Sequence, residues 1–340
     1  MTQHDAASAQ PREGRPASGP ASPASRREPV PPAPRPERSP RRALHGVLLL
    51  DKPLGWTSND ALQKAQGLLR ALKGGHTGTL DPLATGLLPL CFGAATKFSQ
   101  VSLDGDKAYT ATLRLGQRSS TLDGEGEISE GSAPAFDRAT LEAVCARFTG
   151  QLDQLPPLHS ALKKDGRALY EYARAGQDVA RTPRRVTIHR LDVVDWQGQT
   201  LVIDVVCSKG TYIRTLAADL GDALGCGAWL QALRRTASGP LHVRDALTID
   251  ALGALDEDQR AAQLLPPDVL MAEWPAVRLD APEAGRFLSG MRRPIDAADA
   301  AHVRVYGPEP GAFLGAAHIH RGELIADRLL SPLEVSALAA

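Results

Sequence analysis

The sequence is poor in cysteine and in aromatic residues, and it has no long apolar run. Its cysteines are Cys91, Cys145, Cys207 and Cys226. They lie far apart, without a CxxC or Cys/His spacing that suits zinc, so we expect buried thiols in a reducing compartment and no metal site. The longest uncharged apolar stretch, between Asp81 and Lys97, is too short and too interrupted by proline and glycine to span a membrane. Because no signal-peptide core lies near the N-terminus either, we expect a cytoplasmic protein without membrane association.

Common cofactor motifs are absent as well. The sequence contains no GxxxxGK[ST], no GxGxxG after a predicted strand and no HExxH. With 43% hydrophobic and 23% charged residues, it is otherwise typical of a globular protein that has a substantial core. Any catalysis is therefore expected to use a carboxylate, without a cofactor or a metal.

Charge is balanced overall but unevenly distributed. The 39 Lys and Arg residues match 39 Asp and Glu residues, so the whole chain gives no sign of a nucleic-acid partner. Residues 163–190 carry eight basic residues against three acidic ones, whereas residues 246–340 carry eight against fourteen. This distribution fits a polyanion bound over the middle of the chain. Solvated charges on a surface helix and loop explain it equally well.

Residues 1–42 differ in composition from the rest of the chain. They hold ten prolines, eight arginines and four acids, with almost no large apolar side chains. Such a segment cannot bury enough surface to offset its chain entropy, so it is predicted to be disordered. It could be a basic arm that touches phosphates or an inert extension, and the inert extension is favoured. Its Arg and Ser content is shared by organelle transit peptides, but the prolines oppose the helix that those peptides form.

Apolar periodicity predicts mixed secondary structure. Expected strands cover 46–50, 107–116, 185–196 and 200–208, and expected helices cover 57–75, 137–150 and 211–225. Strands and helices do not alternate regularly, which favours an α+β fold with a largely antiparallel sheet. After about residue 275, short strands at 276–279, 302–306 and 312–320 predict a small β-rich C-terminal domain.

The helix expected over 57–75 has clear boundary signals. Thr57 or Ser58 would cap its start, and the glycines at 74–75 would end it. Its apolar stripe consists of Leu62, Ala65, Leu69 and Leu72.

Asp81 is the one acid in the stretch GGHTGTLDPLATGLLPLCFG, residues 74–93. An Asp-Pro pair often only begins a turn. Here, however, His76, Thr77 and Thr79 place polar groups close by, and the apolar LLPLCF that follows would anchor the loop to a core. A rigid loop that holds a lone carboxylate is what a nucleophile or a general base requires.

For three further residues, the sequence allows two interpretations each. Arg214, in the helix start of CSKGTYIRTL, could pair with a carboxylate or could be an ordinary surface cation. Tyr109, in its predicted strand, could be a core aromatic or a platform on which a base stacks. Lys52, between a strand and a helix cap, could hold a phosphate or be solvated.

Together these stretches resemble a known family. DKPLGWTS, GHTGTLDPLATGLLPLCFGAATKFSQ, DKAYTATLRLGQ, LHSALKKDGRALYEYARAG and CSKGTYIRTLAADLGDALGCGAWLQALRR are similar, in order and spacing, to the TruB family of tRNA pseudouridine synthases. The resemblance is close over residues 44–245. It implies a pseudouridine synthase catalytic fold over 43–274, with helices flanking the mixed sheet, and a small PUA-like domain over 275–340.

The resemblance also implies a reaction and a set of site residues. The reaction is the isomerisation of the tRNA T-loop uridine conventionally numbered 55 to pseudouridine, without a cofactor. Asp81 matches the catalytic aspartate, which attacks either the ribose C1′ or the uracil C6, and Arg214 matches the arginine that pairs with it. Tyr109 matches the tyrosine that stacks on the flipped base. The remaining matches are His76, Tyr212 and Leu233 in the uridine pocket and Lys52 near it.

Base extrusion costs a few kcal/mol, and stacking on Tyr109 would offset roughly 1–3 kcal/mol of that cost. The segment 163–190 resembles the insertion with which the family grips the T arm of tRNA, and the resemblance implies a monomer that needs no protein partner. Two departures are Leu122, where many relatives have a small or polar residue, and the acidic C-terminal region. Two alternatives remain: a tRNA-refolding chaperone in which catalysis is secondary, and a guide-directed ribosomal RNA pseudouridine synthase. The short, acidic C-terminus opposes the second.

Overall fold

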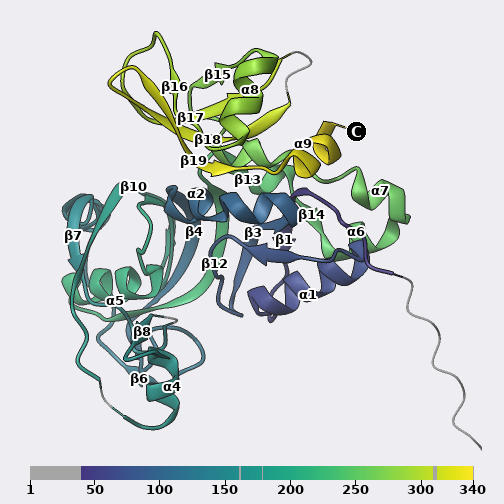
Figure 1. The fold of residues 1–340 in the computed structure, drawn as a ribbon. Helices are drawn as coiled ribbons and strands as arrows, with labels where there is room; N and C mark the ends of the chain where they lie inside the picture. The colour runs from purple at the N-terminus through teal and green to yellow at the C-terminus, as the bar shows by residue number, and fades with distance from the viewer. Residues whose placement is uncertain (1–39, 161, 178, 309–311, 340) are drawn as a thin grey trace, which may run out of the picture. The chain divides into compact units, whose positions relative to one another are not determined.

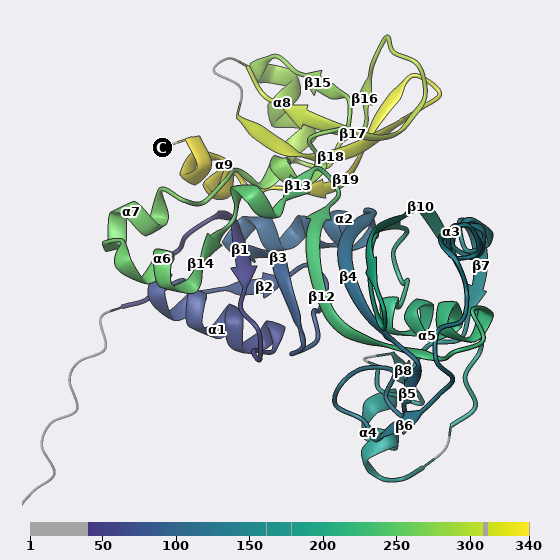
Figure 2. The ribbon, with the colours of Figure 1, turned by 180° about the vertical axis from the view of Figure 1, so that it is seen from behind.

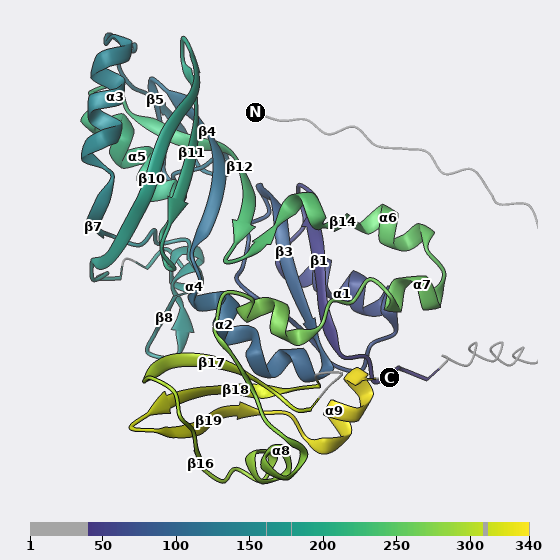
Figure 3. The ribbon, with the colours of Figure 1, turned by 90° about the horizontal axis from the view of Figure 1, so that it is seen from above.

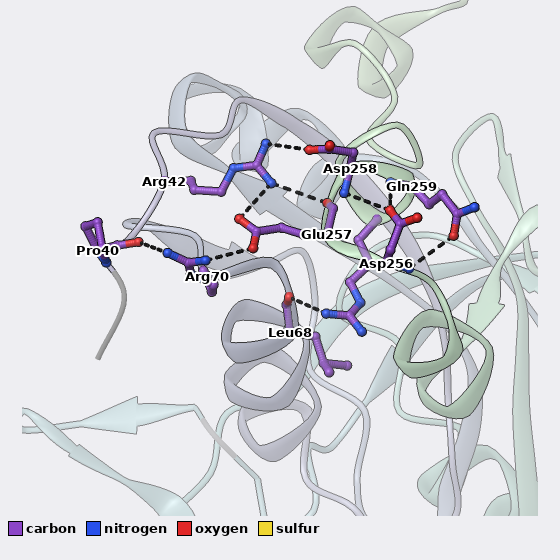
Figure 4. Close-up of polar contacts among 9 residues, drawn as sticks. Pro40, Arg42, Leu68, Arg70, Asp256, Glu257, Asp258 and Gln259 are labelled. Atoms are coloured by element: carbon purple, nitrogen blue, oxygen red, sulfur yellow. Dashed lines mark hydrogen bonds and ion pairs between the residues drawn. The ribbon is translucent and has the colours of Figure 1, made fainter. Parts of the chain in front are cut away.

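The computed structural model describes residues 40–160, 162–177, 179–308 and 312–339. The predicted disordered arm therefore lies outside the described residues, except for residues 40–42. These three residues belong to the folded part (Figure 4). The Arg42 amide donates to the Arg70 carbonyl at 2.7 Å, and Glu257 forms ion pairs with Arg42 at 3.1 Å and with Arg70 at 2.7 Å. The Pro40 carbonyl accepts from Arg70 at 2.6 Å, so the folded part begins earlier than composition indicates.

One large sheet organises the described part of the chain (Figure 1). Its ten strands are β1 (Gly46–Lys52), β2 (Gly74–His76), β3 (Ala84–Phe92), β4 (Lys107–Leu115), β7 (Gly150–Gln154), β10 (Arg184–Gln197), β11 (Thr200–Cys207), β12 (Ala228–Ser238), β13 (Leu241–His242) and β14 (Leu247–Thr248). They follow the order β14-β1-β3-β12-β4-β11-β10-β7, with β2 beside β3 and β13 beside β12. Only the β1–β14 and β3–β12 pairs among them are parallel. The expected α+β fold with a largely antiparallel mixed sheet is confirmed.

Helices cover this sheet (Figure 2). They are α1 (Ser58–Leu69), α2 (Ser99–Asp104), α3 (Arg138–Arg147), α4 (Leu169–Arg174), α5 (Ile213–Ala223), α6 (Ile249–Ala254) and α7 (Glu257–Ala261), with 3-10 turns η1 (Gly93–Phe98), η2 (Val243–Asp245) and η3 (Pro267–Met271). Apolar residues of α3 and α5 share one core with the inner face of β4, β10, β11 and β12. None of the helices in the described residues is long and apolar enough to cross a membrane.

The central strands β1 and β3 are buried on both faces, which explains their unbroken apolar sequences. Val47 and Leu49 pack with the 3-10 turns on one side, whereas Leu48 and Leu50 pack with α1 on the other. β3 alternates in the same way, with all but Thr85 of its nine residues buried. The segment LLPLCF, residues 87–92, forms the buried end of β3 and anchors the loop that precedes this strand, as the sequence predicts.

The first helix is shorter than predicted. Thr57 caps α1 in a capping box with Asp60, as expected, but the helix ends at Leu69, and Arg70 adopts a left-handed conformation (φ 54°). Leu72 is 58% exposed instead of lying in the apolar stripe, and residues 74–76 form strand β2. The Arg70 amide closes the helix locally by donating to the carbonyls of Gln66 and Gly67. The Arg70 side chain adds tertiary contacts with Glu257 and Pro40, which no local pattern encodes.

The C-terminal region forms a separate five-stranded sheet, as predicted (Figure 3). Its elements are β15 (Ala276–Arg278), α8 (Ala281–Leu288), β16 (Arg293–Pro294), β17 (Ala300–Tyr306), β18 (Phe313–His320), β19 (Glu323–Leu329) and α9 (Pro332–Ala339). The strand order is β15-β17-β18-β19-β16. Phe287 of α8 is fully buried in the core of this sheet, together with Val303, Val305 and Leu324.

Two short hairpins complete the chain. They consist of β5 (Gln117–Ser119) with β6 (Ile128–Glu130), and of β8 (Lys163–Lys164) with β9 (Arg167–Ala168). The basic segment 163–190 thus contains the second hairpin and α4, but its residues from 184 onward belong to β10 of the main sheet. The part that lies outside the main sheet is therefore shorter than the segment defined by charge.

Candidate active site

The loop that carries Asp81 joins β2 to β3 and is tied down on several sides. The Leu80 amide donates to Ser58 Oγ at 2.7 Å, and that hydroxyl donates to the Leu80 carbonyl at 3.0 Å. The Thr77 amide donates to the Pro89 carbonyl at 3.1 Å, and Thr77 Oγ1 accepts from Ser102 Oγ at 2.9 Å. Because Leu80 and Thr77 are buried, the loop holds the Asp81 carboxylate in a fixed place.

A cavity of about 260 Å³ opens beside this carboxylate. It is lined by five of the residues that the sequence singles out: Asp81, Tyr109, Tyr212, Arg214 and Leu233. These residues come from the β2–β3 loop, β4, the start of α5 and β12, which lie far apart in the chain. The volume is close to the lower end of the range for small-molecule sites, about 300 Å³.

Arg214 lies between two carboxylates. Its Nη2 is 2.9 Å from Asp81 Oδ2, and its Nη1 is 3.2 Å from Asp123 Oδ2. Nη2 also donates to the His159 carbonyl at 2.8 Å. The side chains of Arg214 and Asp123 are 8% and 4% exposed, whereas that of Asp81 is 44% exposed. Arg214 and Asp123 are therefore buried behind Asp81, and of the two carboxylates that contact Arg214, that of Asp81 is the more exposed.

Asp123 is fixed from its own loop. Its Oδ1 accepts from Thr121 Oγ1 at 2.5 Å and from the Glu125 amide at 3.1 Å, which leaves Oδ2 for Arg214. Leu122, the departure noted in the sequence, has φ 67°, and its carbonyl accepts from the Leu230 amide at 2.9 Å. The left-handed turn at this position suits a small or polar residue better than leucine.

Opposing influences act on the Asp81 carboxyl. Burial is the largest and raises its pKa above the ordinary value of 3.8; the neighbouring Asp123 charge acts in the same direction. The Arg214 guanidinium opposes both and stabilises the ionised form. A carboxylate that is partly desolvated and held by one arginine is well suited to act as a nucleophile or a base.

Tyr212 is positioned through its backbone. Its amide donates to Gln154 Oε1 at 2.7 Å, and its carbonyl accepts from Gln154 Nε2 at 3.0 Å. Gln154, at the end of β7, is buried, so it fixes the entry of the chain into α5. Burial raises the pKa of the Tyr212 phenol.

Lys52 and His76 do not line the cavity. The fully buried Lys52 amine donates to the carbonyls of Trp56 at 2.6 Å and Pro53 at 3.0 Å, and desolvation lowers its pKa to about 8. His76 pairs with Leu90 in the sheet, and burial lowers its pKa. Lys52 thus braces the turn that leads into α1, and the expectation that it lies near the substrate stays a prediction.

Sequence reasoning missed three buried polar residues at this site. Asp123 was one acid among several in its loop, and no local pattern distinguished it. Arg235 follows Arg234 in β12; because neighbouring strand residues point to opposite faces, one of the two had to point inward. Lys107 begins β4, and its amine donates to the carbonyls of Ser102, Leu103 and Gly105 at 2.5–2.9 Å.

Comparison with known proteins agrees with this geometry. Residues 66–213 match the model described as "TruB family pseudouridylate synthase (N terminal domain)". Residues 214–272 match "tRNA pseudouridylate synthase B C-terminal domain", and residues 275–330 match "Pseudouridine synthase II TruB, C-terminal". The chain is 56% identical over 306 residues to tRNA pseudouridine synthase B of Cupriavidus pinatubonensis (strain JMP 134 / LMG 1197), covering 87% of this chain and 97% of that protein. It belongs to the TruB family.

A second relative gives the same result. The chain is 57% identical over 302 residues to tRNA pseudouridine synthase B of Ralstonia nicotianae (strain ATCC BAA-1114 / GMI1000), covering 86% of this chain and 96% of the relative. Among solved structures, "Crystal Structure of a Cbf5-Nop10-Gar1 Complex" has a TM-score of 0.68 at 23% identity and covers 86% of this chain and 87% of that one. This likeness shows a shared fold. The TruB resemblance and the pseudouridine synthase fold inferred from sequence motifs are confirmed.

Metal-ligating side chains and thiols would be alternatives to Asp81 in the part of the TruB chain that the structure describes. The described residues contain no group of three or more His, Cys, Asp and Glu side chains placed to hold a metal ion. All four cysteines are free and buried, and burial raises the pKa of Cys91 and of Cys207 to about 12. Such thiols are poor nucleophiles, so Asp81 remains the best candidate for a reacting group in the cavity.

Proposed function

We propose that this TruB-family chain isomerises the T-loop uridine of tRNA, conventionally numbered 55, to pseudouridine. The relatives named tRNA pseudouridine synthase B support the substrate class, since this chain matches 97% and 96% of their length. The observation that carries the mechanism is the 2.9 Å contact between Asp81 Oδ2 and Arg214 Nη2 beside a cavity that Tyr109 and Leu233 also line. No cofactor takes part in the proposed reaction.

The target base must leave its stack before Asp81 can reach it. Extrusion costs a few kcal/mol, and stacking of the uracil on Tyr109 would return roughly 1–3 kcal/mol. The apolar side chain of Leu233 would cover the ring from another wall of the cavity. Exclusion of water by the filled cavity would strengthen the interaction between Asp81 and Arg214.

The chemical step breaks the C1′–N1 glycosidic bond, and C5 then bonds to C1′. The proton on C5 is released, and N1 gains a proton, so the product is an isomer of the substrate. The ionised Asp81 would attack either the ribose C1′ or the uracil C6, and Arg214 would keep it ionised and oriented. Asp123 would hold Arg214 in place from the protein side.

RNA contacts outside the cavity are assigned to the basic segment 163–190. The β8–β9 hairpin carries Lys163, Lys164 and Arg167, and α4 carries Arg174. The Arg167 guanidinium lies 4.6 Å from the centre of the Tyr172 ring. Phosphate contacts from such residues position a substrate without reading its sequence. We assign catalysis to 43–274 and the smaller domain to 275–340, in a cytoplasmic monomer.

Tritium release tests this function. A T-arm RNA labelled with tritium at C5 of its uridines is incubated with the enzyme, alongside a control RNA in which the target uridine is cytidine. One tritium per RNA is expected from the first substrate and none from the second, because only the isomerised uridine loses its C5 hydrogen. Tight binding of both RNAs without release would contradict the proposal and favour the tRNA-refolding alternative. Release from a ribosomal RNA helix, only with a guide RNA, would favour the guide-directed alternative.

Turnover is expected to fall on the acid side as Asp81 becomes protonated. Burial raises the pKa of this carboxyl above 3.8, and attack requires the ionised form. Activity should therefore be full above the raised pKa and decline as the pH falls through it. Single-turnover tritium release from about pH 4 to about pH 8, with circular dichroism to monitor folding, measures the midpoint. Turnover that stays constant down to the lowest pH in this range, with the protein folded, would contradict a raised pKa for Asp81.

A further inference from the structure

Arg235 is a buried cation that the reaction outlined above does not use. Its side chain is 1% exposed, and it lines the same cavity as Asp81 and Tyr109. Its neighbour Arg234 has an ion pair with Asp51 at 2.7 Å, but none of the ion pairs found in the described residues involves Arg235. A guanidinium so deeply buried without a carboxylate is costly, so its position calls for an explanation.

Two backbone carbonyls fix the Arg235 guanidinium. Its Nε donates to the Leu87 carbonyl of β3 at 2.7 Å, and its Nη2 donates to the Gly78 carbonyl at 3.1 Å. Gly78 lies in the loop that carries Asp81. One side chain thus joins the loop of the proposed nucleophile to the central sheet.

Two glycines make room for this arrangement. A Cβ on Gly86 (φ 100°) would lie 2.3 Å from the Arg235 carbonyl oxygen, so β3 and β12 approach closely only because glycine stands there. A Cβ on Gly78 (φ 91°) would lie 3.4 Å from Arg235 Nη1. The positive φ at both positions also favours glycine over any other residue. The backbone and the head group of Arg235 are therefore both held in place.

The same guanidinium reaches Tyr109. Arg235 and Tyr109 are direct partners in the antiparallel β12–β4 register, so their side chains lie on the same face of the sheet. Burial raises the pKa of the Tyr109 phenol, and the Arg235 guanidinium nearby opposes this rise. Both also line the cavity. Because the hydroxyl oxygen of a tyrosine lies on the axis about which the ring rotates, a guanidinium beside the hydroxyl fixes the direction in which the side chain extends, and so where the ring lies in the cavity.

We propose that Arg235 is a positioning residue that holds the Tyr109 ring in the orientation in which it stacks on the flipped uracil. This inference rests on the proposed function of Tyr109. The guanidinium fork donates from separate nitrogens spread over a rigid plane, Nε to the Leu87 carbonyl and Nη2 to the Gly78 carbonyl, while it also lies beside Tyr109. The single nitrogen of a lysine could not occupy both donor positions. Arg235 would act through Tyr109 and not by contact with the substrate.

A double-mutant cycle tests this role. Wild type, Arg235→Met, Tyr109→Phe and the double variant are compared by tritium release from the T-arm RNA, and KM and kcat are measured separately. Arg235→Met is expected to lower kcat about 30-fold with KM changed less than about 3-fold, because a misplaced ring affects the reacting geometry more than RNA binding. In the Tyr109→Phe background, which lacks the hydroxyl, the same substitution should cost less than about 3-fold.

Arg234→Met is the matched control. It removes an arginine from the adjacent position of β12, where the side chain pairs with Asp51, and it is expected to change kcat less than about 2-fold. Thermal unfolding of each variant monitors folding, and Arg235→Lys, which keeps the charge but not the fork, replaces Arg235→Met in the cycle if the methionine variant does not fold. An equal loss of kcat in the wild-type and Tyr109→Phe backgrounds would overturn the positioning role. Absence of tritium release from the wild type would instead overturn the proposed function itself.

Discussion

Replacement of Asp81 with asparagine is expected to abolish tritium release while leaving the fold and tRNA binding intact. Asparagine has nearly the same shape, and its amide oxygen can still accept the hydrogen bond from Arg214 that the carboxylate accepts at 2.9 Å. An amide, however, is neither a nucleophile nor a base, so we expect turnover to fall by about 10⁴-fold or more. The half-exposed position of Asp81 limits the cost in stability, because little buried charge is lost.

The measurement pairs single-turnover tritium release with filter binding of the same T-arm RNA. Asp192→Asn is a suitable control, since Asp192 is an exposed acid whose ion pair with Arg190, at 3.1 Å, has no link to the cavity. We expect this control to keep wild-type turnover and both variants to bind RNA within about 3-fold of wild type, as exposed ion pairs contribute little. Turnover by Asp81→Asn at even a tenth of the wild-type rate would exclude Asp81 as the reacting group.

Local patterns predicted much of this fold. The strand at 46–50, the strand pair over 185–208 and the helix after Gly210 appear where periodicity places them, because each buries a face that its own sequence defines. Asp81 could be singled out because an isolated acid between buried segments is unusual. The family resemblance, which depends on several motifs in order, added Arg214 as its partner.

The rest depended on contacts between distant parts of the chain. No glycine directly follows Leu69 to signal the end of α1; Arg70 takes the left-handed conformation there, and its side chain pairs with Glu257, 187 residues away. Asp123 and Arg214 are 91 residues apart, and only folding of the β5–β6 loop over α5 joins them. A single sequence shows which residues are polar, but not which of them become buried partners.

Asp123 is the residue that the structure adds to the proposed mechanism, because its carboxylate contacts Arg214, which in turn contacts Asp81. In Asp123→Asn, the amide oxygen would keep the hydrogen bonds from Thr121 and Glu125, which turns the NH₂ group toward Arg214. A donor would then face a donor within a nearly fully buried site, so Arg214 would shift away from its position beside Asp81. We expect turnover to fall about 100-fold and the free energy of unfolding to fall by about 2 kcal/mol, which is less than the cost of a completely unpaired buried charge because Asp81 and His159 still contact Arg214.

The pH profile distinguishes this role from simple destabilisation. The Arg214 guanidinium lowers the pKa of Asp81 more than the Asp123 charge raises it, so displacement of Arg214 should move the acid limb of the turnover profile to higher pH. Glu125→Gln, at an exposed position in the same loop, is the matched control and should change neither turnover nor the acid limb. If Asp123→Asn retained wild-type turnover at a temperature where it is folded, the contact between Asp123 and Arg214 would not be needed for catalysis. An acid limb that moved to lower pH would show that loss of the Asp123 charge, and not loss of the Arg214 contact, dominates the environment of Asp81.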